Sequence, residues 1–124
     1  MRAVFVDANA ALRALAEKIG PAALPSLALA FGDADIRPDA LPALLAGAPI
    51  ALIDHTALPT DIARRCAGLR HVVFLGTGAR SYMDPEALAS IGITVHLIKG
   101  YGDTAVAECA IGLLFDAARK FAAM

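Results

Sequence analysis

The sequence predicts an α/β domain with a five-stranded parallel sheet and helices on both of its faces. Five short apolar runs, each rich in β-branched or aromatic residues, recur along the 124 residues. A segment with helical periodicity or a helix-starting signal follows each run, and Gly, Pro or Asp stands at most boundaries. Strands that are short and apolar throughout are typical of a parallel sheet that is covered on both faces.

The first half of the chain supplies two of these strands and two helices. Residues 3–6 are apolar and end at an aspartate, which predicts a buried first strand. Apolar residues then fall on one helical face over residues 12–19, and the Gly-Pro pair at 20–21 is expected to end that helix. Residues 24–31 form the second apolar run. Residues 38–47 begin with Pro-Asp and end with Gly, which predicts a short helix.

The second half of the chain continues the alternation of strands and helices. Strands are predicted over residues 49–54, 71–75 and 93–98, with helices over residues 59–66 and 84–92. Because the crossovers between parallel strands are right-handed, few arrangements remain. A flavodoxin-like doubly wound order is the simplest of them for a chain of this length.

The last stretch is the longest predicted helix, and it sets the domain division. Two glycines and Asp103 interrupt the preceding strand, and nothing interrupts the helical pattern after them. We therefore divide the chain into a sheet domain over residues 1–102 and a long linker helix over residues 103–124. This helix is apolar on nearly all sides, so it needs covering on more than one side, and we expect it to mediate homo-oligomer formation.

Composition excludes several classes of protein. With 58% hydrophobic and 19% charged residues, the chain is an ordered globular domain. Its net charge of −1, without charged runs, favours neither nucleic acid nor a membrane surface as a partner. The start has no signal-peptide pattern and no apolar stretch is long enough to span a membrane, so we expect a soluble, cytoplasmic protein. Cys66 and Cys109 lack metal-ligand spacing and are expected to be buried free thiols in a reducing compartment.

A parallel sheet of this kind places its ligand site beyond the carboxyl ends of the strands. Gly76-Thr77-Gly78 directly follows the fourth strand, and its backbone N–H groups can approach an anion because glycine has no Cβ. The same three residues also fit an ordinary tight turn. A dinucleotide fingerprint would need a third glycine where Ser81 stands, so the loop does not match one.

Further candidate residues lie at the same edge or next to it. His55 and Thr56 follow the third strand, and Tyr101 lies in the loop after the fifth. Each could line a pocket, but a solvated His and a packed Tyr are the ordinary structural alternatives. Glu108 lies one turn into the last helix, and its carboxylate is expected to interact favourably with the helix dipole. The sequence has no nucleophile elbow, P-loop or metal-ligand cluster, so the residues alone assign no reaction.

Five segments, taken in order, carry a resemblance to a known family. Residues 51–58, 69–78, 83–88, 92–95 and 100–108 resemble the N-terminal, substrate-binding domain of the D-isomer-specific 2-hydroxyacid dehydrogenases. The most specific feature is Gly-Ile-x-Val, followed after a short loop by Val-Ala-Glu on a long helix that reaches an arginine. The resemblance is strongest over the part of the chain from residue 51 to residue 119.

The resemblance implies the substrate-binding part of an oxidoreductase that transfers a hydride between a small 2-hydroxy acid and NAD. It implies that the backbone amides of Thr77 and Gly78 hold the substrate carboxylate, that Tyr101 lines the pocket, and that Thr104 borders the nicotinamide. In that family the long helix leads into a Rossmann NAD-binding domain and helps to make the dimer. The predicted substrate-binding residues are His55, Thr56, Thr77, Gly78 and Tyr101, and the predicted cofactor-binding residue is Thr104.

The resemblance also implies what this chain does not supply. The catalytic Arg, acidic residue and His of the family, and its glycine-rich NAD loop, lie beyond residue 124. We therefore assign no catalytic residue here, and we expect the chain alone to bind neither NAD nor NADP and to be inactive. Arg80 stands where an acid is usual, and Cys109 replaces a common His. These departures leave open which 2-hydroxy or 2-keto acid is used, and the choice between NAD and NADP is open as well.

A response-regulator receiver domain is the alternative from another class. Asp54 would be its phosphorylated residue, with Asp7, Thr77 and Lys99 also at strand ends. Against this interpretation, Asp7 is followed by an alanine where a second acid would help to hold Mg²⁺. Lys99 is followed by Gly100 rather than by proline. A binding module without catalytic function is a further alternative.

Overall fold

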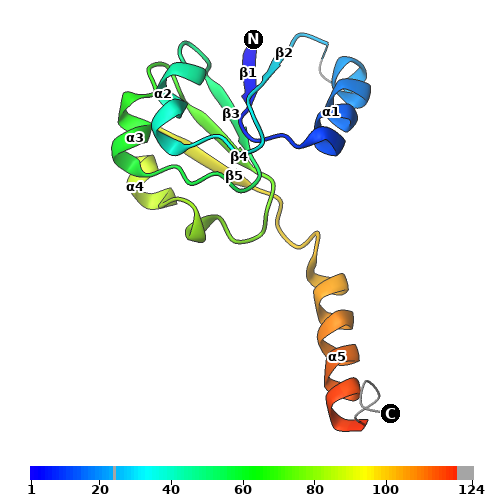
Figure 1. Cartoon of the computed structure of the whole chain (residues 1–124). Coiled ribbons are helices and arrows are strands. Elements are labelled where there is room, and N and C mark those ends of the chain that lie inside the picture. The colour runs from blue at the N-terminus through cyan, green and yellow to red at the C-terminus, as the bar shows by residue number, and fades with distance from the viewer. Residues whose placement is uncertain (24, 120–124) are drawn as a thin grey trace.

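The computed structural model describes residues 1–23 and 25–119, and its centre is a five-stranded parallel sheet. The strand order is β2-β1-β3-β4-β5, and every neighbouring pair is parallel (Figure 1). This is the doubly wound, flavodoxin-like order predicted from the sequence. The strands are β1 (Arg2–Phe5), β2 (Ala28–Phe31), β3 (Ile50–Ile53), β4 (His71–Phe74) and β5 (Thr94–Leu97).

Helices lie on both faces of the sheet, but they cover the two faces unequally. Three short helices, α2 (Leu41–Leu44), α3 (Thr60–Arg65) and α4 (Pro85–Ser90), pack on one face, whereas α1 (Ala10–Ala23) lies beside the other (Figure 1). No described residue of α1 is buried, and an apolar cavity of about 500 Å³ separates this helix from β2 and β3. Two 3-10 turns, η1 (Pro38–Ala40) and η2 (Ala79–Ser81), precede α2 and α4.

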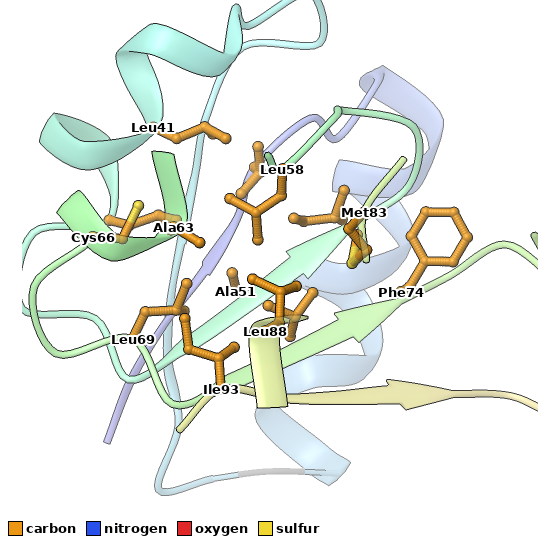
Figure 2. Close-up of a cluster of buried hydrophobic side chains, with 14 of the residues drawn as sticks. Leu41, Ala51, Leu58, Ala63, Cys66, Leu69, Phe74, Met83, Leu88 and Ile93 are labelled. Atoms are coloured by element: carbon orange, nitrogen blue, oxygen red, sulfur yellow. The ribbon is translucent and has the colours of Figure 1, made fainter. Parts of the chain in front are cut away.

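The hydrophobic core fills the space between the sheet and the three short helices. Alternate residues of β3 and β4, such as Ala51 and Phe74, point into it and are buried. Leu88 of α4 and Leu58 of the loop before α3 meet them from the helix side (Figure 2). Because these strands alternate, Leu52 faces the opposite side of the sheet, where it lines the cavity beside α1.

The element boundaries agree with most of the sequence predictions, and the main difference is in α1. This helix continues through Pro21 to Ala23, so the predicted end at the Gly-Pro pair is wrong. Pro21 lacks the N–H that would bond the Glu17 carbonyl and its ring crowds that carbonyl, and the helix ends two residues later. At α4, by contrast, Asp84 is the predicted N-cap and accepts bonds from the N–H groups of Glu86 and Ala87, at 3.1 and 3.0 Å.

The last helix, α5 (Asp103–Arg119), projects away from the sheet domain (Figure 1). None of its described residues is buried, and large apolar side chains are exposed along it. The predicted helix extends to residue 124, and its last five residues lie outside the described part of the chain. Among the helices of residues 1–23 and 25–119, none is long and apolar enough to cross a membrane.

Candidate functional site

The candidate site lies at the carboxyl edge of the sheet, where the loops after four strands come together. β1, β3, β4 and β5 are consecutive neighbours in the sheet, so the loops that follow them are neighbours as well. These loops carry Asp7, the 54–56 segment, the Gly76-Thr77-Gly78 turn and Tyr101. The strand order therefore brings the predicted site residues to one edge, as the fold class predicts.

Asp7 follows β1, and its fully buried carboxylate organises the loop after β3. One carboxylate oxygen accepts a hydrogen bond from the Asp54 N–H at 2.9 Å. The other accepts bonds from the His55 N–H at 2.8 Å, from the Thr56 N–H at 2.6 Å and from the Thr56 hydroxyl at 2.7 Å. Burial alone would raise the pKa of Asp7, but these four bonds outweigh it, so the pKa lies below its usual value. The carboxylate is therefore the stable form.

His55 lies at the surface of this loop between acceptors on both sides. Its Nδ1 is 3.2 Å from the Asp54 carboxylate and 3.5 Å from that of Asp7, and its Nε2 is 3.1 Å from the Ala34 carbonyl oxygen. A ring can donate to acceptors on both nitrogens only when it is protonated. The bond to Asp54 is the main reason why the pKa of His55 is raised. The side chain is 48% exposed, and the raised pKa extends the pH range over which the ring is protonated beside the two carboxylates.

Thr56, also predicted to bind substrate, points inward. It is buried, and its hydroxyl donates to Asp7 rather than to the space above the sheet. In this arrangement Thr56 orients the loop and leaves His55 as the more accessible residue of the pair. A direct role for Thr56 in substrate binding stays a prediction.

The turn after β4 is shaped by a close contact between its backbone and a ring. A Cβ on Gly76 would lie 2.7 Å from Cε1 of Phe74, so a side chain there would collide with the buried aromatic residue. Thr77 and Gly78 follow at the surface, and η2 then fixes the end of the turn through a bond from the Ser81 N–H to the Gly78 carbonyl, at 3.1 Å. Within the described part of the chain, the N–H groups of Thr77 and Gly78 have no hydrogen-bond partner.

The loop after β5 lies beside this turn. The Tyr101 hydroxyl is 3.3 Å from the Leu75 carbonyl oxygen, to which it donates, while 62% of the residue remains exposed. A Cβ on Gly102 would lie 3.9 Å from Cγ2 of Thr77, which is ordinary van der Waals contact. Thr104 is exposed in the first turn of α5. Tyr101, Thr77 and Gly78 thus come together, with exposed polar groups on adjoining loops.

Sequence reasoning found the positions at this edge but missed how Asp7 acts. An aspartate directly after a buried strand is visible in the sequence, yet the three residues that donate its four hydrogen bonds lie 47 to 49 positions further along the chain. The receiver interpretation gave Asp7 a role in Mg²⁺ binding, whereas both of its oxygens here accept hydrogen bonds from the chain itself. Both cysteines are free, as predicted, and Cys66 is buried, but the predicted burial of Cys109 is wrong because this residue lies on the exposed helix α5.

Comparison with known proteins gives the same fold. The structure is similar to D-lactate dehydrogenase from Escherichia coli (TM-score 0.70, 16% identity) and to NAD⁺-bound 3-phosphoglycerate dehydrogenase from Entamoeba histolytica (0.71, 18%). It is also similar to the pyruvate reductase of Chlamydomonas reinhardtii (0.64, 18%). Each comparison covers 94% of this chain. At these identities the likeness establishes a shared α/β fold.

The chain spans little more than a third of these dehydrogenases, 37%, 38% and 34% of their lengths in the order given. No protein-family model matches the sequence, and no curated protein matches it either. The structural neighbours do not favour the receiver-domain alternative, because the solved structures named above are reductases and dehydrogenases.

Proposed function

We propose that this chain is the substrate-binding part of an NAD-dependent D-2-hydroxyacid dehydrogenase and that it holds the carboxylate of a small 2-hydroxy or 2-keto acid. The observation that carries the proposal is the pair of unpartnered N–H groups of Thr77 and Gly78 at the carboxyl end of β4. Their position on a fold shared with known dehydrogenases supports this reading. We place the protein in the cytoplasm.

Each residue of the site has a physical part in this proposal. Backbone N–H groups at a strand end are fixed dipoles, so they neutralise a carboxylate without the cost of ordering a side chain. Tyr101 adds a ring and a hydroxyl on the adjoining loop, and His55, when protonated, offsets part of the negative charge of the Asp7 and Asp54 carboxylates. A carboxylate anchored in this way orients the neighbouring 2-hydroxyl or 2-keto group for reaction.

NAD or NADP would accept or supply the hydride in the complete enzyme. Thr104, exposed in the first turn of α5 beside the substrate loops, fits the border of a nicotinamide ring. The turn at residues 76–81 does not fit the pyrophosphate, because Ser81 stands where the fingerprint needs its third glycine. The proposal therefore assigns substrate binding, and not hydride transfer, to these 124 residues.

The test is an NMR titration of the chain with pyruvate and, separately, with D-lactate. We expect saturable shifts of the Thr77 and Gly78 amides and of the Tyr101 region. A matched pair of variants separates charge from shape: Gly78→Asp adds a negative charge beside the amides, and Gly78→Asn adds a side chain of similar shape without charge. A Cβ at this position meets Ser81 Oγ only at 3.9 Å, so both variants should fold. Binding should be weakened far more by Gly78→Asp than by Gly78→Asn.

Two results would contradict the proposal. Equal pyruvate affinity of Gly78→Asp and Gly78→Asn would mean that the substrate carboxylate does not bind at the Thr77 and Gly78 amides. Shifts at Asp54, Thr77 and Lys99 with beryllofluoride and Mg²⁺, without a response to the keto acid, would favour a receiver domain instead.

We also propose that the chain forms a homo-oligomer through α5. The exposed apolar side chains along this helix support the proposal, because a surface of this kind is rare on a monomer.

A further inference from the structure

Two histidines face each other on the side of the sheet opposite the main core. His71 opens β4 and His96 lies in β5, and Nδ1 of His71 is 3.1 Å from Nε2 of His96. Their ring centroids are 5.3 Å apart. Both residues are exposed, whereas their neighbour Val72 is buried in the core on the other face. The pair lies away from the candidate substrate site, since His71 is at the amino end of its strand.

The sheet holds the two rings in this relation. His71 is the register partner of Thr94, and His96 is the partner of Val73, so the two histidines are diagonal neighbours on one face. Diagonal neighbours on a sheet are within reach of each other when their side chains are long or aromatic. The backbone hydrogen bonds between β4 and β5 fix both Cα positions. The two side chains therefore lose little conformational entropy when a ligand binds to both rings.

The separation of the two nitrogens suits a metal ion between them. Zn²⁺ binds histidine nitrogen at about 2.0–2.1 Å, and with a nitrogen–nitrogen distance of 3.1 Å this gives an angle of roughly 100° at the metal. That angle lies between the values for octahedral and tetrahedral coordination. Imidazole is a preferred ligand of zinc, nickel and copper ions. The pair therefore has the spacing of two adjacent ligands of one transition-metal ion.

We propose that His71 and His96 form a two-histidine chelate for a divalent transition-metal ion, with water in the remaining positions. In the metal-free chain one ring donates a proton to the other across the 3.1 Å contact. On binding, the donor ring gives up that proton and takes one from water on its other nitrogen. Both rings then present a lone pair to the metal while remaining neutral, so the step releases no net proton. In the described part of the chain, no acidic side chain forms an ion pair with either ring.

The test uses Ni²⁺ as the probe. The chain has three histidines, so two of them are the proposed ligands and the third, His55, provides a control. Substoichiometric Ni²⁺, which is paramagnetic, should broaden the amide signals around residues 71 and 96 in the NMR spectrum, and EDTA should restore them. Calorimetry should give one Ni²⁺ per chain. His71→Gln and His96→Gln should each weaken binding at least about tenfold, since even the loss of a group that only supports a ligand costs roughly 10–100-fold.

His55→Gln is the matched control, because it removes a histidine that lies at the other end of the sheet beside two carboxylates. It should leave Ni²⁺ affinity unchanged. Broadening centred on residues 54–56, or loss of binding in His55→Gln alone, would overturn the proposal. Unchanged affinity in both His71→Gln and His96→Gln would also overturn it. All three side chains are exposed, so a dispersed amide spectrum can verify that each variant is folded.

Discussion

Thr56 donates both its backbone N–H and its hydroxyl to the same carboxylate oxygen of Asp7, at 2.6 and 2.7 Å. The two residues are 49 positions apart in the chain, and both are buried. This pair of bonds ties the end of β1 to the loop after β3. It therefore sets the position of His55, which lies next to Thr56 at the candidate site.

Replacing Asp7 with asparagine should destabilise the fold strongly. The asparagine side chain keeps one acceptor oxygen and presents an NH₂ group where backbone N–H donors converge, so donors are left unpaired in a buried site. We expect a loss of at least about 3 kcal/mol in the free energy of unfolding, measured by urea denaturation. Asp39→Asn, on an exposed side chain, is the control and should change stability by less than about 0.5 kcal/mol.

The Thr56 hydroxyl can be tested separately from its backbone. Thr56→Val keeps the shape of the side chain but leaves one lone pair of Asp7 without its donor, which should cost about 1–2 kcal/mol in the free energy of unfolding. Thr56→Ser keeps the hydroxyl and should cost less. If Thr56→Val is as stable as the native chain, the hydroxyl bond contributes nothing, and the backbone N–H groups alone hold the carboxylate.

Stability should fall in acid because of Asp7. The pKa of Asp7 is lower in the folded chain than in the unfolded one, so its contribution is present above the unfolded value and is lost as the pH falls through the folded value. The decline should therefore begin near the ordinary aspartate pKa of about 3.9. Urea midpoints measured along an acid series should show this decline in the native chain, and the part due to Asp7 should be missing in Asp7→Asn.

We expect His55 to give a weaker dependence of stability on pH, in the opposite direction to that of Asp7. Its pKa is raised, mainly by the bond to Asp54, so its contribution is fully present below the unfolded value of about 6.5 and is lost as the pH rises through the folded value. Because the side chain is half exposed, solvent screening keeps the effect small. His55→Gln should remove it, so the difference in stability between the native chain and His55→Gln should shrink as the pH rises above about 6.5, and a difference that does not change with pH would contradict the assignment.

The sequence was informative where local chemistry decides the structure. The Asp84 cap and the parallel strands follow from short patterns, because a cap needs only its own first turn and a buried strand needs only its own composition. The contact between His71 and His96 depends on strand register, and the four bonds of Asp7 depend on which loops become neighbours. Pro21 did not end α1 at the predicted residue, because the proline ring clashes with the turn before it and does not prevent the two residues after it from keeping helical dihedral angles.

Gly76 links the core to the turn that we propose binds the substrate, so its substitution should affect both stability and binding. In Gly76→Ala the new methyl group would lie 2.7 Å from the Phe74 ring, and the turn must shift to relieve the collision. Overpacking of this kind costs about 1–3 kcal/mol in the free energy of unfolding. Pyruvate binding should weaken as the amides of Thr77 and Gly78 move. Gly78→Ala adds the same methyl group at ordinary contact distance, 3.9 Å from Ser81 Oγ, and should leave stability nearly unchanged.

Self-association through α5 should depend on which side of the helix is changed. Val106 and Leu113 are 68% and 64% exposed and lie on one side of the helix, and Ile111 and Phe115 lie on the opposite side, also exposed. Two double variants compare these sides: Val106→Gln with Leu113→Gln, and Ile111→Gln with Phe115→Gln. Glutamine is a good helix former, so both variants should keep the helix while removing apolar surface.

Sedimentation velocity over a range of concentrations should show reversible association of the native chain. The double variant on the contact side should raise the dissociation constant, because each buried leucine-sized side chain contributes about 1.5–3 kcal/mol to an apolar contact. The other double variant should have a smaller effect if one side makes the contact, and equal effects would mean that α5 is covered on both sides. A native chain that stays monomeric at its highest soluble concentration would refute an oligomer formed by this helix.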